Sequence, residues 1–275
     1  MTIIKLALCQ MNVVDDKDAN IKKASEMISA SIDKNADFII LPEMFNCPYS
    51  NDKFIEYCEE EKTSKTLKAI SRLAGENNVY ILSGSIPEKD AGKLYNTSYL
   101  FDKTGKIIAK HRKMHLFDID VKDKITFKES DVLTAGDSVT IADTDFGKIG
   151  IGICYDVRFP ELARLMVEKG ALILVYPGAF NMTTGPAHWE LLLRSRALDN
   201  QVYCVGVAPA LNRDACYHSY GHSIVANPWG EVSAQGDEKE QVIVCDVDLS
   251  EIKKIREELP LLKNKREDLY EVKLK

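Results

Sequence analysis

Short apolar runs rich in Ile, Val and Tyr recur along the chain, and they limit its possible folds more than any other feature. Continuous apolar runs of this length are typical of central strands covered on both faces. Helical periodicity fills two of the gaps, over residues 19–32 and 186–200. Strands that alternate with helices predict an α/β fold. The six runs are Ile3–Met11, Asp37–Leu41, Val79–Gly84, Ile149–Cys154, Ala171–Tyr176 and Val202–Ala208.

A second set of strands is less apolar and is partly joined by tight turns. Lys103–Gly105 and Pro228–Gly230 are turn sequences of the kind that connect hairpins. Hairpins within an α/β chain predict mixed rather than purely parallel sheets. The strands of this set are Leu94–Asp102, Lys106–Lys110, Val139–Asp143, His222–Asn227 and Gln241–Asp248.

Residues 1–275 are predicted to form a single domain. The sequence has no repeat, low-complexity tract or Pro/Gly/Ser-rich linker, and a domain of this length buries about three quarters of its unfolded surface. The C-terminal extension, residues 249–275, differs: a helical pattern breaks at Pro260, and a charged stretch follows. Such a tail either dangles or packs on a neighbouring subunit, and we expect it to pack on a partner.

Charge and hydropathy exclude several classes of partner. The chain carries 36 Lys and Arg against 42 Asp and Glu, a net charge of −6, which argues against a nucleic-acid partner. The N-terminus lacks the charged and apolar regions of a signal peptide, and no 18 apolar residues run together, so neither export nor membrane insertion is expected. Seven scattered cysteines without a C-x-x-C pair favour a reducing compartment, the cytoplasm.

Cys154 is the best candidate for a nucleophile. It ends the strand-like run 148–154, and Pro160 then stands where a helix should begin. A cysteine at this junction exposes its sulfur at the carboxyl end of a strand, where α/β sheets bind ligands. The alternative for an isolated cysteine is a small buried hydrophobe. We assign that role to the other six cysteines.

A cysteine thiol must be activated to act as a nucleophile, since its usual pKa near 8.5 leaves little thiolate at neutral pH. Glu43 directly follows a buried-type strand, so it is also expected at a carboxyl strand end; the alternative is a surface turn. Lys113 lies where the strand 106–110 ends in a basic turn. The alternative to a catalytic role, for each basic residue of Lys110–Lys113, is a position on a solvated strand edge.

These segments together resemble the carbon–nitrogen hydrolase (nitrilase) superfamily over nearly the whole chain. The catalytic glutamate, lysine and cysteine of the family correspond to Glu43, Lys113 and Cys154, and its auxiliary glutamate corresponds to Glu129. The resemblance implies a nitrilase-like α-β-β-α sandwich and a homodimer, the commonest closed assembly. It also implies a small-molecule amide substrate, water as the second reactant and no cofactor.

Within the superfamily the sequence is most similar to the omega-amidase branch. This likeness rests on residues 41–49, 176–190, 194–203 and 265–270. Two departures are Cys47, where that branch is expected to have serine, and the loop Asn212–Tyr217. The branch implies hydrolysis of small dicarboxylate monoamides, namely α-ketoglutaramate, α-ketosuccinamate and succinamate, to the dicarboxylate and ammonia.

The resemblance also suggests roles in binding. The backbone N–H of Tyr155 is expected to stabilise an oxyanion together with Lys113. Arg158 is the candidate clamp for a substrate carboxylate, because a guanidinium binds carboxylate bidentately; a structural salt bridge is the alternative. Four further residues are expected to wall the pocket: Tyr49, Phe117, Ala179 and Phe180.

Other interpretations of the same residues remain. His111 and His115, like His218 and His222, have i, i+4 spacing, but on strand-like or loop segments this spacing is not expected to converge on zinc, and we expect no metal. A Cys–His dyad with His188 or His222 is a second option. A deaminated-glutathione amidase or an N-carbamoyl hydrolase would keep the same catalytic residues, and a non-catalytic scaffold is the alternative outside enzymes.

Overall fold

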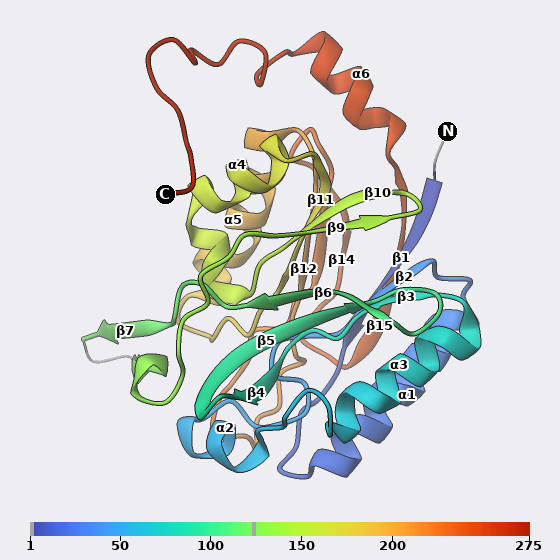
Figure 1. Ribbon diagram of the computed structural model, residues 1–275, viewed down its shortest axis with the longest axis vertical. Helices are drawn as coiled ribbons and strands as arrows, with labels where there is room; N and C mark the ends of the chain where they lie inside the picture. The colour runs from blue at the N-terminus through green and yellow to red at the C-terminus, as the bar shows by residue number, and fades with distance from the viewer. Residues whose placement is uncertain (1–2, 123–124) are drawn as a thin grey trace.

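The fold is a four-layer sandwich of two facing β-sheets with helices on both outer faces (Figure 1). The computed structural model describes residues 3–122 and 125–275, so Met1 and Thr2 of the predicted N-terminal pattern lie outside the described residues. The α-β-β-α sandwich expected from the sequence is confirmed. None of the helices in the described ranges has the length and apolar character needed to span a bilayer.

The first sheet is mixed. Its strand order is β15-β1-β2-β3-β5-β4, with β6 also paired to β5. The central strands β1, β2 and β3 are parallel, whereas β15, β4, β5 and β6 pair antiparallel. Its strands are β1 (Ile3–Gln10), β2 (Phe38–Ile40), β3 (Tyr80–Leu82), β4 (Ile86–Asp90), β5 (Lys93–Phe101), β6 (Ile107–Arg112) and β15 (Gln241–Asp248).

The second sheet has the order β14-β13-β12-β11-β10-β9. Strands β10, β11 and β12 are parallel, and antiparallel strands complete both edges. Its strands are β9 (Thr140–Thr144), β10 (Gly147–Ile151), β11 (Ala171–Pro177), β12 (Tyr203–Val207), β13 (Ile224–Ala226) and β14 (Val232–Gln235). A separate hairpin comprises β7 (Asp118–Val121) and β8 (Ile125–Lys128).

Helices cover each sheet on one face. The helices are α1 (Lys17–Ile32), α2 (Asn51–Tyr57), α3 (Lys65–Asn77), α4 (Pro160–Glu168), α5 (Gly185–Asn200) and α6 (Ser250–Glu258), with short 3-10 helices η1 (Glu129–Asp131) and η2 (Cys154–Arg158). Helices α1 and α3 pack on the first sheet, and α4 and α5 on the second (Figure 1).

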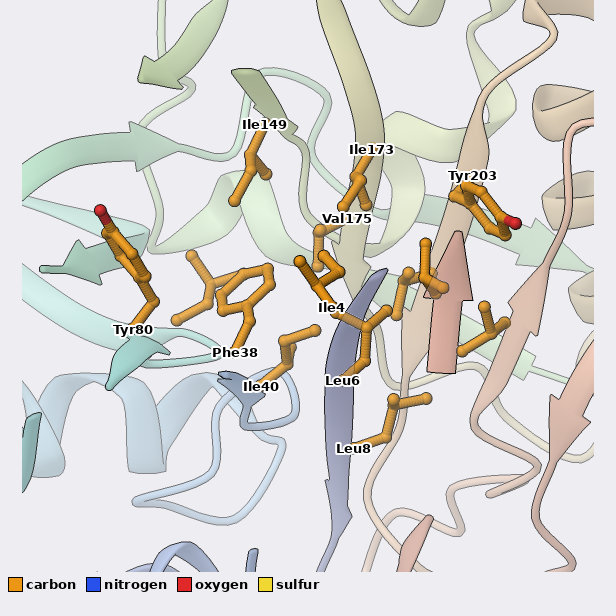
Figure 2. Close-up of a cluster of buried hydrophobic side chains, with 14 of the residues drawn as sticks. Ile4, Leu6, Leu8, Phe38, Ile40, Tyr80, Ile149, Ile173, Val175 and Tyr203 are labelled. Carbon is orange, nitrogen blue, oxygen red and sulfur yellow. The ribbon is translucent and has the colours of Figure 1, made fainter. Parts of the chain in front are cut away.

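The core between the sheets is made by alternate, inward-facing residues of neighbouring strands in both sheets. Figure 2 shows Ile4, Leu6, Phe38 and Ile40 of the first sheet meeting Ile173 and its neighbours on the second. These side chains are almost completely buried. Because burial of apolar area is the main stabilising contribution in folding, this shared core fixes how the strand ends of the two sheets lie against each other.

The apolar runs predicted all six central strands, and both predicted hairpin turns are present. Gly105 and Gly230 have φ of +80° and +84°, the left-handed conformation that glycine adopts without a Cβ clash. Strand ends shift by at most three residues, β15 has the predicted bounds, and β13 is shorter than predicted. Residues 222 and 223 precede it because the φ of His222, +57°, is incompatible with a strand.

The tail begins as predicted, with α6 ending two residues before Pro260. The chain then arcs from α6 back toward α4, where it ends (Figure 1). Along this path the backbone oxygen of Leu259 accepts a hydrogen bond from Gln201, and Lys265 forms an ion pair with Glu168. The tail therefore contacts its own chain; packing on a partner stays a prediction, as does the single domain.

The assignment of six cysteines as buried hydrophobes is wrong for two of them. Cys9, Cys47, Cys204 and Cys245 are buried, but Cys216 is exposed and Cys58 is half-buried. Cys216 lies in the surface loop 212–217, and Cys58 caps α2, where its thiol donates to the backbone oxygen of Ile55. All seven thiols are free.

Candidate active site

The four predicted catalytic residues follow four different strands. Glu43 comes after β2, Lys113 directly after β6, and Cys154 after β10, where it opens η2. Glu129 follows β8 and opens η1. Because β2 and β10 are parallel strands in facing sheets, their carboxyl ends present Glu43 and Cys154 to a common site.

A buried lysine binds two carboxylates at this site. Lys113 Nζ lies 2.9 Å from Glu43 Oε1 and 2.9 Å from Glu129 Oε2, with all three side chains fully buried. The hydroxyl of Tyr49 donates to Glu129 Oε1 at 2.7 Å, and the amide of Phe117 donates to Glu129 Oε2 at 2.7 Å. Two negative charges thus share one positive charge away from water.

Two further donors fix the orientation of Glu43. Asn96 Nδ2 donates to Glu43 Oε1 at 2.8 Å, and the backbone amide of Ala179 donates to Oε2 at 2.7 Å. Sequence reasoning missed Asn96. The signal available was a polar residue inside the predicted strand 94–102, whose buried position requires a hydrogen-bond partner.

Burial and charge shift the proton affinities of the site in defined directions. Burial raises the pKa of Glu43, Lys113 opposes this shift, and Glu129 adds to it. Burial also disfavours the charge on Lys113, yet Glu129 and Glu43 hold its pKa well above the ordinary value. Burial and the nearby Glu43 carboxylate raise the pKa of Cys154. The pKa shifts therefore favour the neutral thiol at Cys154 and make Glu43 a stronger base than an exposed glutamate.

Cys154 stands in a strained turn. Its φ is +47°, a left-handed conformation that costs a non-glycine residue about 1–3 kcal/mol. Among the described residues, no oxygen accepts a hydrogen bond from the amide of Tyr155, the next residue. That amide is therefore available to a ligand beside the sulfur.

The predicted pocket residues, except Tyr49, line one small cleft with Cys154. The cleft has about 170 Å³ of empty space, open solvent included, and is lined by Phe117, Cys154, Tyr155, Arg158, Ala179, Phe180 and Thr184. Tyr49 instead lies with Glu43 in a neighbouring pocket of about 410 Å³, open solvent included, which is also lined by Cys47 and the loop residues Asn212, Ala215, Cys216 and Tyr217.

Arg158 supplies the cleft with a cation that has no acidic partner within the described part of the chain. Its guanidinium packs 4.8 Å from the ring of Phe180 and 5.4 Å from that of Tyr155. One terminal nitrogen lies 3.2 Å from His188 Nδ1, while Nε is buried without a hydrogen bond to the described residues. Burial lowers the pKa of Arg158. The alternative of a structural salt bridge is not what the structure shows.

His111 and His115 lie on either side of Asp156, whose carboxylate is 3.0 Å from His111 Nε2 and 2.7 Å from His115 Nδ1. No hydrogen bond in the described ranges joins Cys154 to His188 or His222. In those ranges no group of three or more His, Cys, Asp or Glu side chains is arranged to hold a metal ion.

Comparison with known proteins gives consistent matches over the full length. The family model described as carbon-nitrogen hydrolase matches residues 5–257. The proteins named omega-amidase NIT2 of Bos taurus and Homo sapiens are each 49% identical over 275 residues, covering 100% of this chain and 99% of theirs. The crystal structure of Saccharomyces cerevisiae Nit3, described as a member of branch 10 of the nitrilase superfamily, superimposes with a TM-score of 0.89 at 43% identity, covering 96% of this chain and 97% of that one. The chain therefore belongs to the carbon–nitrogen hydrolase family and is a hydrolase of carbon–nitrogen bonds.

Proposed function

We propose that this protein is an omega-amidase that hydrolyses small dicarboxylate monoamides to the dicarboxylate and ammonia. The single observation that carries the proposal is the cleft in which Cys154 lies together with Arg158, a cation that has no acidic partner among the described residues. One end of the cleft can attack an amide, and the other can bind a carboxylate. The names of the relatives, omega-amidase, support the same substrate class.

In the proposed first step, Glu43 takes the thiol proton of Cys154. The raised pKa of both groups favours this assignment, because the thiol is protonated at rest and the carboxylate is a stronger base than an exposed glutamate. The resulting thiolate attacks the amide carbon. A sulfur–carbon bond forms, and the carbonyl oxygen becomes an oxyanion.

The oxyanion needs preorganised donors. The Lys113 ammonium and the free amide of Tyr155 are the candidates, and a well-placed donor contributes roughly 3–4 kcal/mol to the transition state. Glu129 holds Lys113 through the ion pair at 2.9 Å, so the cation keeps its place when Glu43 is protonated. Protonated Glu43 then donates to the amide nitrogen, the carbon–nitrogen bond breaks, and ammonia leaves a thioester on Cys154.

Water completes the turnover. Glu43, again a carboxylate, removes a proton from a water molecule as its oxygen attacks the thioester carbon. The second tetrahedral intermediate breaks its carbon–sulfur bond, the sulfur regains the proton from Glu43, and the acid departs as the carboxylate. The carboxylic acid gives its proton to the released ammonia, so the balance is one amide and one water in, one carboxylate and one ammonium ion out, with no cofactor.

Arg158 would select the substrate by its far carboxylate. It faces the aromatic rings of Tyr155 and Phe180 rather than an acid, so its positive charge is not neutralised by the described protein groups. A hydrogen bond to a charged group contributes about 1.5–3 kcal/mol. We therefore propose α-ketoglutaramate, α-ketosuccinamate and succinamate as substrates, each with a carboxylate a few atoms from the amide.

The proposal extends to the compartment and the assembly of the protein. All seven cysteines are free thiols, which supports a reducing compartment such as the cytoplasm. The exposed apolar residues of the tail, among them Leu269 and Tyr270, support assembly as a homodimer.

Ammonia release from a set of five compounds tests the function. We expect fast turnover of α-ketoglutaramate and succinamate, slower turnover of deaminated glutathione, a carbamoyl amino acid and a simple nitrile, and none with Cys154→Ala. Preference for one of the last three compounds would overturn the omega-amidase assignment while keeping the thiol mechanism. Turnover by Cys154→Ala at the wild-type rate would overturn the mechanism itself.

A further inference from the structure

Asp156, two residues after the nucleophile, has a carboxylate that is completely buried and accepts four hydrogen bonds. Oδ2 accepts from the amide of Ile153 at 2.9 Å and from His111 Nε2 at 3.0 Å. Oδ1 accepts from the amide of His115 at 2.9 Å and from His115 Nδ1 at 2.7 Å. A buried carboxylate is tolerated only with such full hydrogen bonding.

The four donors come from two segments that carry catalytic groups. His111 and His115 stand two residues before and two residues after Lys113. Ile153 immediately precedes Cys154. One carboxylate therefore links the backbone that carries Lys113 to the turn that carries Cys154. His115 and Asp156 are 41 positions apart in the sequence.

The protons of this cluster can be assigned. Burial disfavours the charge on Asp156, but the hydrogen bonds from His111 and His115 hold its pKa well below the ordinary value, so it is ionised and only accepts. His111 Nε2 and His115 Nδ1 must then carry hydrogens. The other nitrogen of His111 is engaged with Thr140 Oγ1 at 2.9 Å, and the ring of His115 stacks on Phe159 at 3.6 Å. Both rings serve as fixed donors.

The turn at Cys154 needs such support. A left-handed φ of +47° at a cysteine persists only when the surroundings hold it. The bond from the Ile153 amide to Asp156 fixes the residue before the strained one, and the histidine bonds anchor Asp156 to the segment around Lys113. A shift of about 1 Å between reacting groups can cost a hundredfold in rate.

We propose that Asp156, held by His111 and His115, is a positioning residue that fixes Cys154 relative to Lys113. It touches neither substrate nor the reacting atoms. The inference does not depend on which amide is the substrate, because it concerns the placement of the thiol.

The test compares paired histidine variants. His115→Asn keeps a side-chain N–H close to the position of Nδ1, and His111→Gln keeps one close to Nε2, whereas leucine at either position removes the donor. Each folded variant, checked by circular dichroism, is measured for kcat per folded molecule. The rate at which iodoacetamide alkylates Cys154 is followed by mass spectrometry of the peptide that carries it, because Cys216 is also exposed and Cys58 is half-buried. Because alkylation needs no substrate, this readout stays valid if the omega-amidase proposal fails.

We expect the leucine variants and Asp156→Asn to lose about tenfold to a hundredfold in both rates. The Asn and Gln variants should recover most of each loss. Glu88→Gln is the matched control, since Glu88 is a buried carboxylate that binds Lys110 and Arg112 on β6 but nothing in the Cys154 turn. It should lower the melting temperature with little change in the alkylation rate per folded molecule.

Two results would overturn the proposal. One is wild-type alkylation and kcat in folded leucine variants, which would leave the cluster with a purely structural role. The other is an Asn or Gln variant as slow as its leucine counterpart, which would show that the imidazole itself acts in the chemistry. Should Asp156→Asn fail to fold, the histidine pairs still decide between these outcomes.

Discussion

At the scale of single residues, the proposed mechanism requires Glu43 to accept and release protons beside the ammonium group of Lys113. Lys113 at 2.9 Å stabilises its negative charge, while burial and Glu129 oppose that charge, and the balance raises the pKa. A glutamate near an ammonium ion would otherwise be a very weak base. Burial, with Glu129 adding to it, thus makes Glu43 a stronger base, as the proposed proton transfer from the thiol requires.

The acid limb of the pH–rate profile should reflect this balance. In the proposed mechanism only the Glu43 carboxylate is active, and its raised pKa places loss of activity above the usual value near 4.5. We expect kcat/KM to fall with decreasing pH through a midpoint above 4.5, measured with α-ketoglutaramate over a range in which the fold is intact. Glu43→Gln should lose roughly 10²- to 10⁴-fold in kcat. A midpoint at or below the ordinary glutamate value would contradict the argument.

Arg158 gives a prediction about specificity. Arg158→Lys keeps the charge but loses the bidentate geometry, so kcat/KM for α-ketoglutaramate should fall about tenfold or more, mostly through KM. A neutral amide such as propionamide should be hydrolysed as by the wild type, because it has no carboxylate to bind. Arg256→Lys serves as the control, since Arg256 is also half-buried with an unpaired Nε but lies on α6. An equal loss of kcat/KM for both amides would show that Arg158 does not bind the substrate carboxylate.

The sequence could indicate most of the candidate site because its residues follow strands in recognisable motifs. The motifs identified Glu43, Lys113 and Cys154, which the structure brings together in one buried site with Glu129. Asn96 and Asp156 were missed for a physical reason: each acts through hydrogen bonds to residues far away in the chain. A single sequence contains no record of which buried polar residues face each other.

At the scale of elements, the end of β11 presses against the nucleophile turn. A Cβ on Gly178 would lie 2.9 Å from the ring of Trp189 and 3.2 Å from the Cα of Cys154. Contacts this short force the neighbours to move. The absence of a side chain at Gly178 is therefore a condition for the position of Cys154.

Gly178→Ala should disturb stability and reactivity together. We expect a loss of roughly 1–3 kcal/mol in the free energy of unfolding and slower alkylation of Cys154. Gly206→Ala on β12 is the control, because the three atoms nearest to its Cβ would belong to Trp189 and Leu193. Thermal melts and iodoacetamide rates separate the two effects. Equal slowing of alkylation in both variants would mean that only the Trp189 packing matters.

The elements also show where sequence patterns succeed. Apolar runs predicted the buried strands because strands in facing sheets are covered on both sides. Helices α2 and α3 were not predicted. Helix α2 has seven residues and buries only Phe54 and Tyr57, which leaves too little periodicity to recognise. Helix α3 does bury one face, at Leu67, Ile70 and Leu73, so its pattern was present and overlooked.

At the scale of the whole molecule, the two sheets share one core, so the positions of Glu43 and Cys154 depend on the entire sandwich. The tail after α6 lies outside this core, and the core does not account for its apolar side chains. It runs along its own chain through Lys265 and Glu168, yet leaves Leu269 69% and Tyr270 58% exposed. Apolar side chains in a charged, extended stretch bury little surface within one chain, which favours a second copy as the covering surface.

Removal of residues 261–275 tests that assembly. If the tail packs on a partner, the truncated protein should sediment as a lighter species than the full chain at equal concentration, because burial of a single Leu or Tyr side chain contributes about 1.5–3 kcal/mol. Leu269→Ser with Tyr270→Ser should act in the same direction without shortening the chain. Ile55→Ser is the control, since Ile55 is 54% exposed on α2, away from the tail. An unchanged mass after truncation would show that the tail serves only its own subunit, and the homodimer would then have to form through the body of the sandwich.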